Sequence, residues 1–137
     1  MIMNENCPFC GSAREEGRML KEGKYAYVIV SNPRLMPGHL LVIPKRHCEG
    51  RLEDLTKEER DEIFELLAEF QAKILEKLAS GCDIRQNFKP YVENSTTHVN
   101  HMHFHLYPRE NEDELYKKVD EHRKPLYQDL TDEERKR

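Results

Sequence analysis

Four of the seven histidines lie between residues 98 and 105. His101, His103 and His105 alternate with apolar residues, and strict alternation is typical of a half-buried β-strand. In a strand, side chains two residues apart lie on one face, about 6.5 Å from one another. Because imidazole changes protonation near neutral pH, three imidazoles on one face predict acid–base, nucleophilic or metal-binding chemistry.

Three alternatives remain open for this histidine run. It could be a surface strand that happens to be rich in histidine, although clean alternation is a poor fit to chance. It could bind a metal through imidazole bonds of about 2.1 Å. The outer pair, His101 and His105, would lie about 13 Å apart along a strand, so one ion could not easily hold all three. Separate roles for the three side chains are the more economical hypothesis.

Cys7-Pro8-Phe9-Cys10 is a C-x-x-C turn, whereas Cys48 and Cys82 stand alone. A thioredoxin-like pair should lie between a strand and a helix. Here polar and glycine-rich sequence flanks the turn, which favours a zinc knuckle. The turn supplies two of the four ligands that a structural zinc ion takes, so the others must come from elsewhere in the chain. A C-x-x-C turn without metal is the alternative.

The length and composition suit a compact enzyme of one domain with a highly charged surface. The chain has 137 residues, with 22 basic and 26 acidic side chains and a formal net charge of -4. That balance argues against a nucleic-acid or membrane-surface binder. Residues 1–6 have neither the basic nor the apolar region of a signal peptide, and no apolar run approaches the roughly 20 residues of a membrane span. We therefore expect a cytoplasmic protein.

The elements that must position these side chains can also be read from the sequence. Short apolar runs beside turn residues predict strands over 19–20, 25–30, 39–43 and 82–88. Thr56 followed by Glu59 is a capping-box sequence, and it opens the clearest helix, which we expect Gly81 to end as the residue after the C-cap. The apolar stripe of that helix, which we expect to lie in the core, comprises Ile63, Phe64, Leu66, Leu67, Phe70, Ile74, Leu75 and Leu78. Strands on both sides of one long helix predict an α+β domain with an antiparallel sheet.

The C-terminal part is more polar. Residues 113–122 predict a short helix that stops near Pro125. Residues 131–137 are so highly charged that we expect a frayed or disordered end.

The run from His101 to Tyr107 resembles the motif of the histidine-triad (HIT) family, in which three histidines alternate with hydrophobic residues. Residues 37–45, with the sequence PGHLLVIPK, resemble the second strand of that family, and the helix from Thr56 to Leu78 lies where the family has its long helix. The resemblance covers roughly residues 7–110. It implies one HIT-like domain over residues 1–137, with 7–110 as its core and 123–137 as a C-terminal tail.

The resemblance implies a nucleotide hydrolase or transferase. Such enzymes attack the α-phosphate of a nucleoside phosphoester, anhydride or phosphoramidate through a covalent nucleotidyl-histidine, which divides one difficult step into two easier ones. His103 would be the nucleophile, and His105 would bond the phosphate oxygens or the leaving group. His101 and His39 would join the same cluster. A phosphorylase or nucleotidylyltransferase with the same intermediate is an alternative, and so is a non-catalytic nucleotide-binding protein stabilised by zinc.

The resemblance also implies contacts to the small-molecule nucleotide. Thr97, four residues before the first triad histidine, would donate to phosphate. Ser31 lies at the position that holds ribose hydroxyls in the family, although Asn32 is the better chemical candidate. Asn87 could supply another substrate contact. Family members are commonly homodimers, with the long helix and a central strand at the interface.

In zinc-bearing members two histidines complete the C-x-x-C turn. The corresponding residues here are His47 and His101, so the resemblance implies a structural Zn²⁺ site made of Cys7, Cys10, His47 and His101. His98 and Cys48 are competing ligands.

Overall fold

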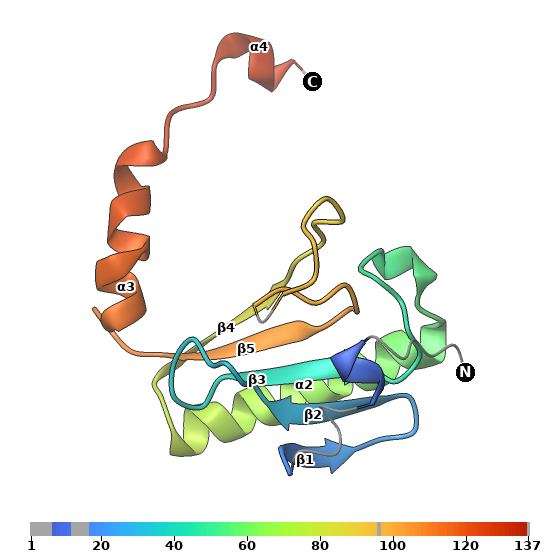
Figure 1. Ribbon diagram of the computed structural model, residues 1–137. Helices are drawn as coiled ribbons and strands as arrows, with labels where there is room; N and C mark the ends of the chain where they lie inside the picture. The colour runs from blue at the N-terminus through green and yellow to red at the C-terminus, as the bar shows by residue number, and fades with distance from the viewer. Residues whose placement is uncertain (1–6, 12–16, 96, 137) are drawn as a thin grey trace.

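The computed structural model describes residues 7–11, 17–95 and 97–136. Its centre is one antiparallel sheet of five strands with a long helix across one face (Figure 1). The strands follow the spatial order β1-β2-β3-β5-β4. Their bounds are Met19–Glu22 (β1), Ala26–Val30 (β2), Leu40–Pro44 (β3), Gly81–Gln86 (β4) and Phe104–Arg109 (β5). The predicted α+β class is confirmed.

Helix α2, Lys57–Lys77, begins as the sequence predicts. The Thr56 side chain accepts a hydrogen bond from the Glu59 backbone N–H, and the Glu59 carboxylate accepts one from the Thr56 N–H. This capping box satisfies two backbone donors that the first turn would leave without partners. The predicted end is wrong. Leu78 is the C-cap, and Gly81 is the first residue of β4, because the chain turns back toward the sheet through residues 79 and 80.

The apolar residues of α2 occupy two faces rather than one. Five of them are buried against the sheet, namely Ile63, Leu66, Leu67, Phe70 and Ile74. Phe64, Leu75 and Leu78 are instead 72%, 46% and 62% exposed, so the prediction that they belong to the core is wrong. Leu75 and Leu78 come 11 and 14 residues after Phe64, which is close to a whole number of helical turns in each case. The three side chains therefore lie together on a face beside the buried one.

The sheet has an apolar core on each face. Side chains on the α2 side include Val28, Val42 and Leu106, whereas Ile29 and Leu41 point to the opposite side. The strands β2 and β3 are therefore buried on both faces, which explains their continuous apolar sequence. The second face is covered at one end by the turn η1, Pro8–Cys10.

The histidine run is only partly a strand. Its apolar members Met102 and Leu106 are buried on the α2 side, as the alternation predicts. However, β5 begins at Phe104, so the expected strand from His101 is wrong at its start. Pairing with β3 ends where Phe104 lies opposite Val42, and beyond that point the Met102 N–H donates to the Cys48 carbonyl instead.

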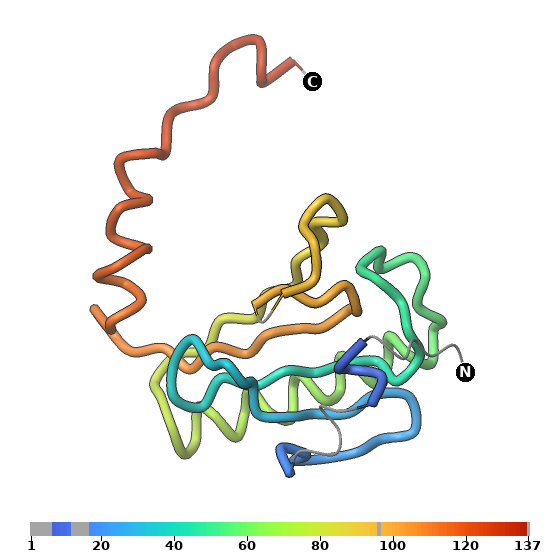
Figure 2. Tube along the Cα trace, viewed as in Figure 1, coloured from blue at the N-terminus to red at the C-terminus, as the bar shows by residue number. Residues whose placement is uncertain are grey.

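Beyond β5 the chain leaves the sheet and projects away from it (Figures 1 and 2). The Arg109 guanidinium anchors this departure by pairing with Asp83, Asp113 and Asp120 at 2.5–2.8 Å. Asp113 and then Asp120 raise the pKa of Arg109, and the guanidinium lowers the pKa of Asp113. These ion pairs thus join β4 and β5 to residues 113 and 120 of the segment that follows β5.

The predicted short C-terminal helix is confirmed, but it ends earlier than expected. Helix α3 covers Glu114–Lys118, and the 3₁₀ helix η3 continues it over Asp120–Leu126. The predicted disordered end instead contains one capped turn, α4, Asp132–Arg135, with Arg137 outside the described residues. The remaining short element is η2, Leu52–Asp54. Among the described residues no helix combines the length and apolarity that a membrane span needs.

Candidate functional site

A cavity of about 670 Å³ lies over the sheet face opposite α2. His39 just before β3 and His105 on β5 line it, together with His103 just before β5. His101 does not line this cavity, because its side chain is fully buried beside the C-x-x-C turn. The structure therefore separates the first triad histidine from the other two.

The backbone sets which ring nitrogen of His103 carries the proton. His103 Nδ1 lies 2.7 Å from the carbonyl oxygen of His101. A carbonyl can only accept, so Nδ1 must donate and the neutral ring keeps its lone pair on Nε2. An imidazole with a free Nε2 lone pair in a cavity is a potential nucleophile.

A second chain of hydrogen bonds sets the proton position on His105. The Leu35 N–H donates to His39 Nδ1 at 3.0 Å, so His39 carries its proton on Nε2. That nitrogen lies 2.9 Å from His105 Nδ1, which must accept. His105 then carries its proton on Nε2, where it can donate to a substrate oxygen. The cavity thus holds a lone pair on His103 and a proton on His105, with the two ring centroids 4.9 Å apart.

Burial keeps these three rings neutral. Loss of solvation lowers the pKa of His39 to about 4 and that of His105 to about 3, with repulsion from His103 as the next cause in each case. Burial also lowers the pKa of His103. At pH 7 the Nε2 atom of His103 is therefore unprotonated without the help of a separate base.

Three of the four predicted substrate contacts line the cavity, namely Ser31, Asn32 and Thr97. Ser31 is buried at the end of β2, where its hydroxyl donates to the Pro33 carbonyl, whereas Asn32 is exposed. Asn87 does not line the cavity, and its side-chain oxygen accepts a hydrogen bond from Arg85. The substrate roles of all four stay predictions.

Tyr107 and Arg18 also line the cavity, although the sequence predicted no role for either. The ring of Tyr107 lies 4.8 Å from that of His39 and 5.3 Å from that of His105. Extending the alternation by one step beyond His105 would have placed it on this face. Arg18, whose guanidinium donates to the Val30 carbonyl, has no comparable signal, because it comes just before β1 in a stretch without periodicity.

A second group of side chains forms a buried cluster behind the histidine run. Ligand atoms of Cys7, Cys10, His47 and His101 all lie within 4.8 Å of one another. The Nδ1 atom of His101 is 3.3 Å from the Cys7 sulfur, 3.5 Å from the Cys10 sulfur and 3.1 Å from His47 Nδ1. Ligands bound at about 2.1–2.3 Å to one tetrahedral zinc ion lie roughly 3.4–3.8 Å apart. The donor set and spacing therefore fit this ion.

Local contacts direct each histidine of the cluster. His101 Nε2 donates to the Pro44 carbonyl at 2.8 Å, which leaves Nδ1 unprotonated and facing the sulfurs. His47 follows Arg46, whose guanidinium pairs with the buried Glu59 carboxylate at 2.8 Å and holds this segment against the start of α2. The capping box of the long helix thus also positions a candidate ligand.

Neither competing ligand belongs to the cluster. His98 Nε2 contacts the Asn100 side chain at 2.9 Å. The Cys48 thiol donates to the Arg46 carbonyl, and burial raises its pKa to about 11.

Phe9 connects the cluster to the cavity. It lies between the two cysteines of the turn, and its ring contacts His103 edge-on with centroids 5.1 Å apart. Tyr27 donates a hydrogen bond from its hydroxyl to the Phe9 carbonyl, which holds the turn on the sheet. The turn therefore forms both half of the ligand set and one wall of the cavity.

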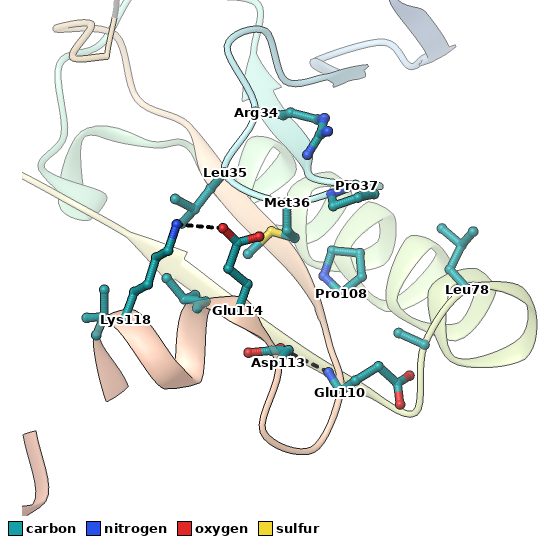
Figure 3. Close-up of a pocket in the computed structure, with 13 residues that line it drawn as sticks. Arg34, Leu35, Met36, Pro37, Leu78, Pro108, Glu110, Asp113, Glu114 and Lys118 are labelled. Atoms are coloured by element: carbon teal, nitrogen blue, oxygen red, sulfur yellow. Dashed lines mark hydrogen bonds and ion pairs between the residues drawn. The ribbon is translucent and has the colours of Figure 1, made fainter. Parts of the chain in front are cut away.

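A smaller cavity of about 440 Å³ lies between the β2–β3 loop, the end of α2 and α3 (Figure 3). Pro37, Pro108 and Leu78 form its apolar floor. Among its charged groups, Lys118 pairs with Glu114, and the Asp113 carboxylate accepts a hydrogen bond from the Glu110 N–H. It contains no histidine or cysteine, so the larger cavity is the candidate active site.

The family model described as the HIT domain matches residues 13–112 of this chain. The chain belongs to the HIT family. A bis(5'-adenosyl)-triphosphatase of Dictyostelium discoideum is 32% identical over 105 residues, which are 73% of this chain and 68% of the relative. A bis(5'-nucleosyl)-tetraphosphatase of Schizosaccharomyces pombe is 33% identical over 66% of this chain and 48% of the relative. This HIT protein thus spans between about half and two thirds of the length of these curated relatives.

Solved structures give the same assignment. A HIT family protein from Bacillus anthracis superposes with a TM-score of 0.66 and 26% identity over 79% of this chain and 76% of the other. A zinc-bound histidine triad family protein from Mycobacterium smegmatis has a TM-score of 0.62 and 26% identity over 80% of this chain and 79% of the other. The predicted family resemblance is confirmed, and the zinc-bearing branch is supported by the second structure and the cysteine–histidine cluster.

Proposed function

We propose that this HIT protein hydrolyses dinucleoside polyphosphates or related nucleotides at the α-phosphate, through a covalent nucleotidyl intermediate on His103. The observation that carries this proposal is the pair of opposite proton positions in one cavity. His103 presents a lone pair on Nε2, and His105 presents a proton on Nε2. The names of the curated relatives, a triphosphatase and a tetraphosphatase, support the substrate class.

In the first step the Nε2 lone pair of His103 forms a bond to the α-phosphorus. The bond from that phosphorus to the bridging oxygen breaks, its electron pair stays on the leaving group, and the Nε2–H of His105 donates to that group. The modified His103 ring is cationic, and its Nδ1–H remains bonded to the His101 carbonyl, which stabilises the positive ring. In the second step water attacks the same phosphorus and loses a proton to the solvent. The nitrogen–phosphorus bond breaks and returns its electron pair to His103, which is then neutral again.

The test uses a panel of diadenosine triphosphate, diadenosine tetraphosphate and adenosine 5'-phosphoramidate, each with and without inorganic phosphate. We expect release of adenosine monophosphate in every case, without any need for phosphate, measured by anion-exchange chromatography. Release of adenosine diphosphate only when phosphate is present would indicate a phosphorylase instead. Absence of turnover on the whole panel, together with nucleotide binding, would indicate the non-catalytic alternative.

The cysteine–histidine cluster supports a structural zinc ion as the cofactor. Zinc would join the N-terminal turn to the segment after β3 and to His101, whose carbonyl orients the nucleophile. All four ligand positions would come from protein side chains, so the ion would not offer an open position to substrate. The C-x-x-C turn in a chain of four cysteines fits a reducing compartment, and with the net charge of -4 it supports a cytoplasmic protein whose ligand is a small nucleotide rather than nucleic acid.

Exposed apolar residues support a homodimer as the assembled state. Phe64, Leu75 and Leu78 share one exposed face of α2, and Ile84 is 43% exposed on the edge strand β4. We expect light scattering to give twice the 16.3 kDa of one chain, and Leu75→Glu to shift the mass toward the monomer. Leu126→Glu, in the exposed tail, is the matched control and should leave the mass unchanged. A monomeric mass for the unmodified chain would exclude this interface.

A further inference from the structure

The edge strand β4 places a cation beside the candidate active site. Arg85 lies directly opposite His105 in the antiparallel pairing of β4 with β5. Residues directly opposite one another project from the same face of a sheet, with Cβ atoms about 4.5–5.5 Å apart. The Arg85 side chain therefore leaves the sheet on the cavity side, next to the histidine that can donate a proton to substrate.

The charge of Arg85 is not neutralised within the described residues. Its guanidinium Nε donates to the Asn87 side-chain oxygen at 3.0 Å, and it forms no ion pair with a described carboxylate. Asp83, the next residue on the same face of β4, is instead paired with Arg109 at 2.7 Å. Arg85 also contributes, after burial and the neighbouring histidines, to the low pKa of His105. The guanidinium is thus held at one nitrogen by a neutral group, with its other donors available to an anion.

The order of the strands gives the direction in which a nucleotide would extend. The ribose candidates Ser31 and Asn32 follow β2, on one side of β5 in the sheet, and Arg85 lies on β4, on the other side. A substrate with its ribose near β2 and its α-phosphate at His103 must direct its leaving group toward β4. Arg85 lies at that edge together with Asn87, which holds its guanidinium.

We propose that Arg85, held by Asn87, is a specificity-determining residue that binds the phosphates of an anionic leaving group. This subsite rests on the proposed function and defines its substrate class further as phosphoanhydrides, in preference to phosphoramidates with a neutral amine. The guanidinium fork matches phosphate oxygens and can form two parallel charge-assisted hydrogen bonds. When the bond to the bridging oxygen breaks, the leaving phosphate gains negative charge next to Arg85, so the contact strengthens as the reaction proceeds.

The test compares Arg85→Gln with the unmodified protein on two substrates, diadenosine tetraphosphate and adenosine 5'-phosphoramidate. We expect kcat/KM to fall about tenfold or more for the tetraphosphate and less than about twofold for the phosphoramidate, since only the first has an anionic leaving group. Arg85→Lys should recover part of the loss, because it restores the charge but not the fork. Arg60→Gln, an exposed arginine on α2, is the control and should change neither value.

The outcomes separate the subsite from the proposed function. An equal loss on both substrates, or none on the tetraphosphate, would overturn the subsite. Intact-protein mass spectrometry after mixing Arg85→Gln with the phosphoramidate should still detect the adduct on His103. Absence of any adduct and any turnover with the unmodified protein would overturn the proposed function itself, and the subsite with it. Thermal unfolding of Arg85→Gln should match that of Arg60→Gln, since both side chains are exposed.

Discussion

Replacement of His103 by alanine should reduce kcat/KM for nucleotide hydrolysis by about 10⁴-fold or more, on the scale seen when a covalent nucleophile is removed. His103 supplies the Nε2 lone pair that forms the bond to phosphorus, and no other cavity histidine has an unprotonated nitrogen free of a hydrogen bond. The measurement is steady-state turnover of diadenosine triphosphate. Mass spectrometry of samples that are quenched without acid detects the adduct. The variant should show no adduct at this position.

His98 offers a matched control for that substitution. It is also a half-buried histidine of the same run, but its Nε2 contacts Asn100 and it does not line the cavity. We expect His98→Ala to keep turnover within about threefold of the unmodified protein, as for a side chain that touches neither substrate nor nucleophile. Unchanged turnover in His103→Ala would contradict the mechanism, whatever His98→Ala shows.

Removing one ligand of the metal site should have the second large effect, lowering both the zinc content of the protein and its stability. We expect the purified protein to contain about one zinc ion per chain and Cys7→Ala to contain almost none, because a tetrahedral structural site needs all its ligands. With free zinc at about 1,000 times the dissociation constant, bound zinc stabilises the folded state by roughly 4 kcal/mol. For a chain of this size that corresponds to a fall in the unfolding midpoint of about 10–15 °C. Metal analysis and calorimetry measure the two quantities.

Controls separate the loss of metal from the loss of a buried side chain. Cys82→Ala, on β4, and Cys48→Ala, which removes a predicted competitor, should both retain zinc. Treating the unmodified protein with a chelator removes the ion but keeps Cys7, so it should reproduce most of the loss of stability. Unmodified protein without zinc, expressed in medium that contains it, would contradict the site.

Local sequence patterns predicted most of the framework for local physical reasons. The alternation after His101 indicated which residues face the core, because the side chains of an extended chain change sides at every residue. The capping box at Thr56 marked the start of α2, because its hydrogen bonds join residues only three positions apart. The same locality explains the errors. The apolar residues of α2 could not be divided into a buried and an exposed face from the sequence, because which face is covered depends on where the helix meets the sheet.

The sequence by itself determined the kinds of chemistry present, namely a histidine run with period two and a cysteine pair that needed two further ligands. The family resemblance implied a separate role for each histidine, but only the tertiary structure decided the proton positions and surroundings that suit them to those roles. His101 lies beside the cysteines, before the point at which β5 begins to pair with β3. The carbonyl of His101 sets the proton position on His103, and the backbone N–H of Leu35 sets those on His39 and, through it, on His105. The proton position on an imidazole depends on the donor or acceptor that meets each nitrogen, and here such partners also come from elements far apart in the sequence. Arg85 shows the same dependence, since nothing in its own stretch of sequence places it opposite His105, and only the pairing of β4 with β5 does.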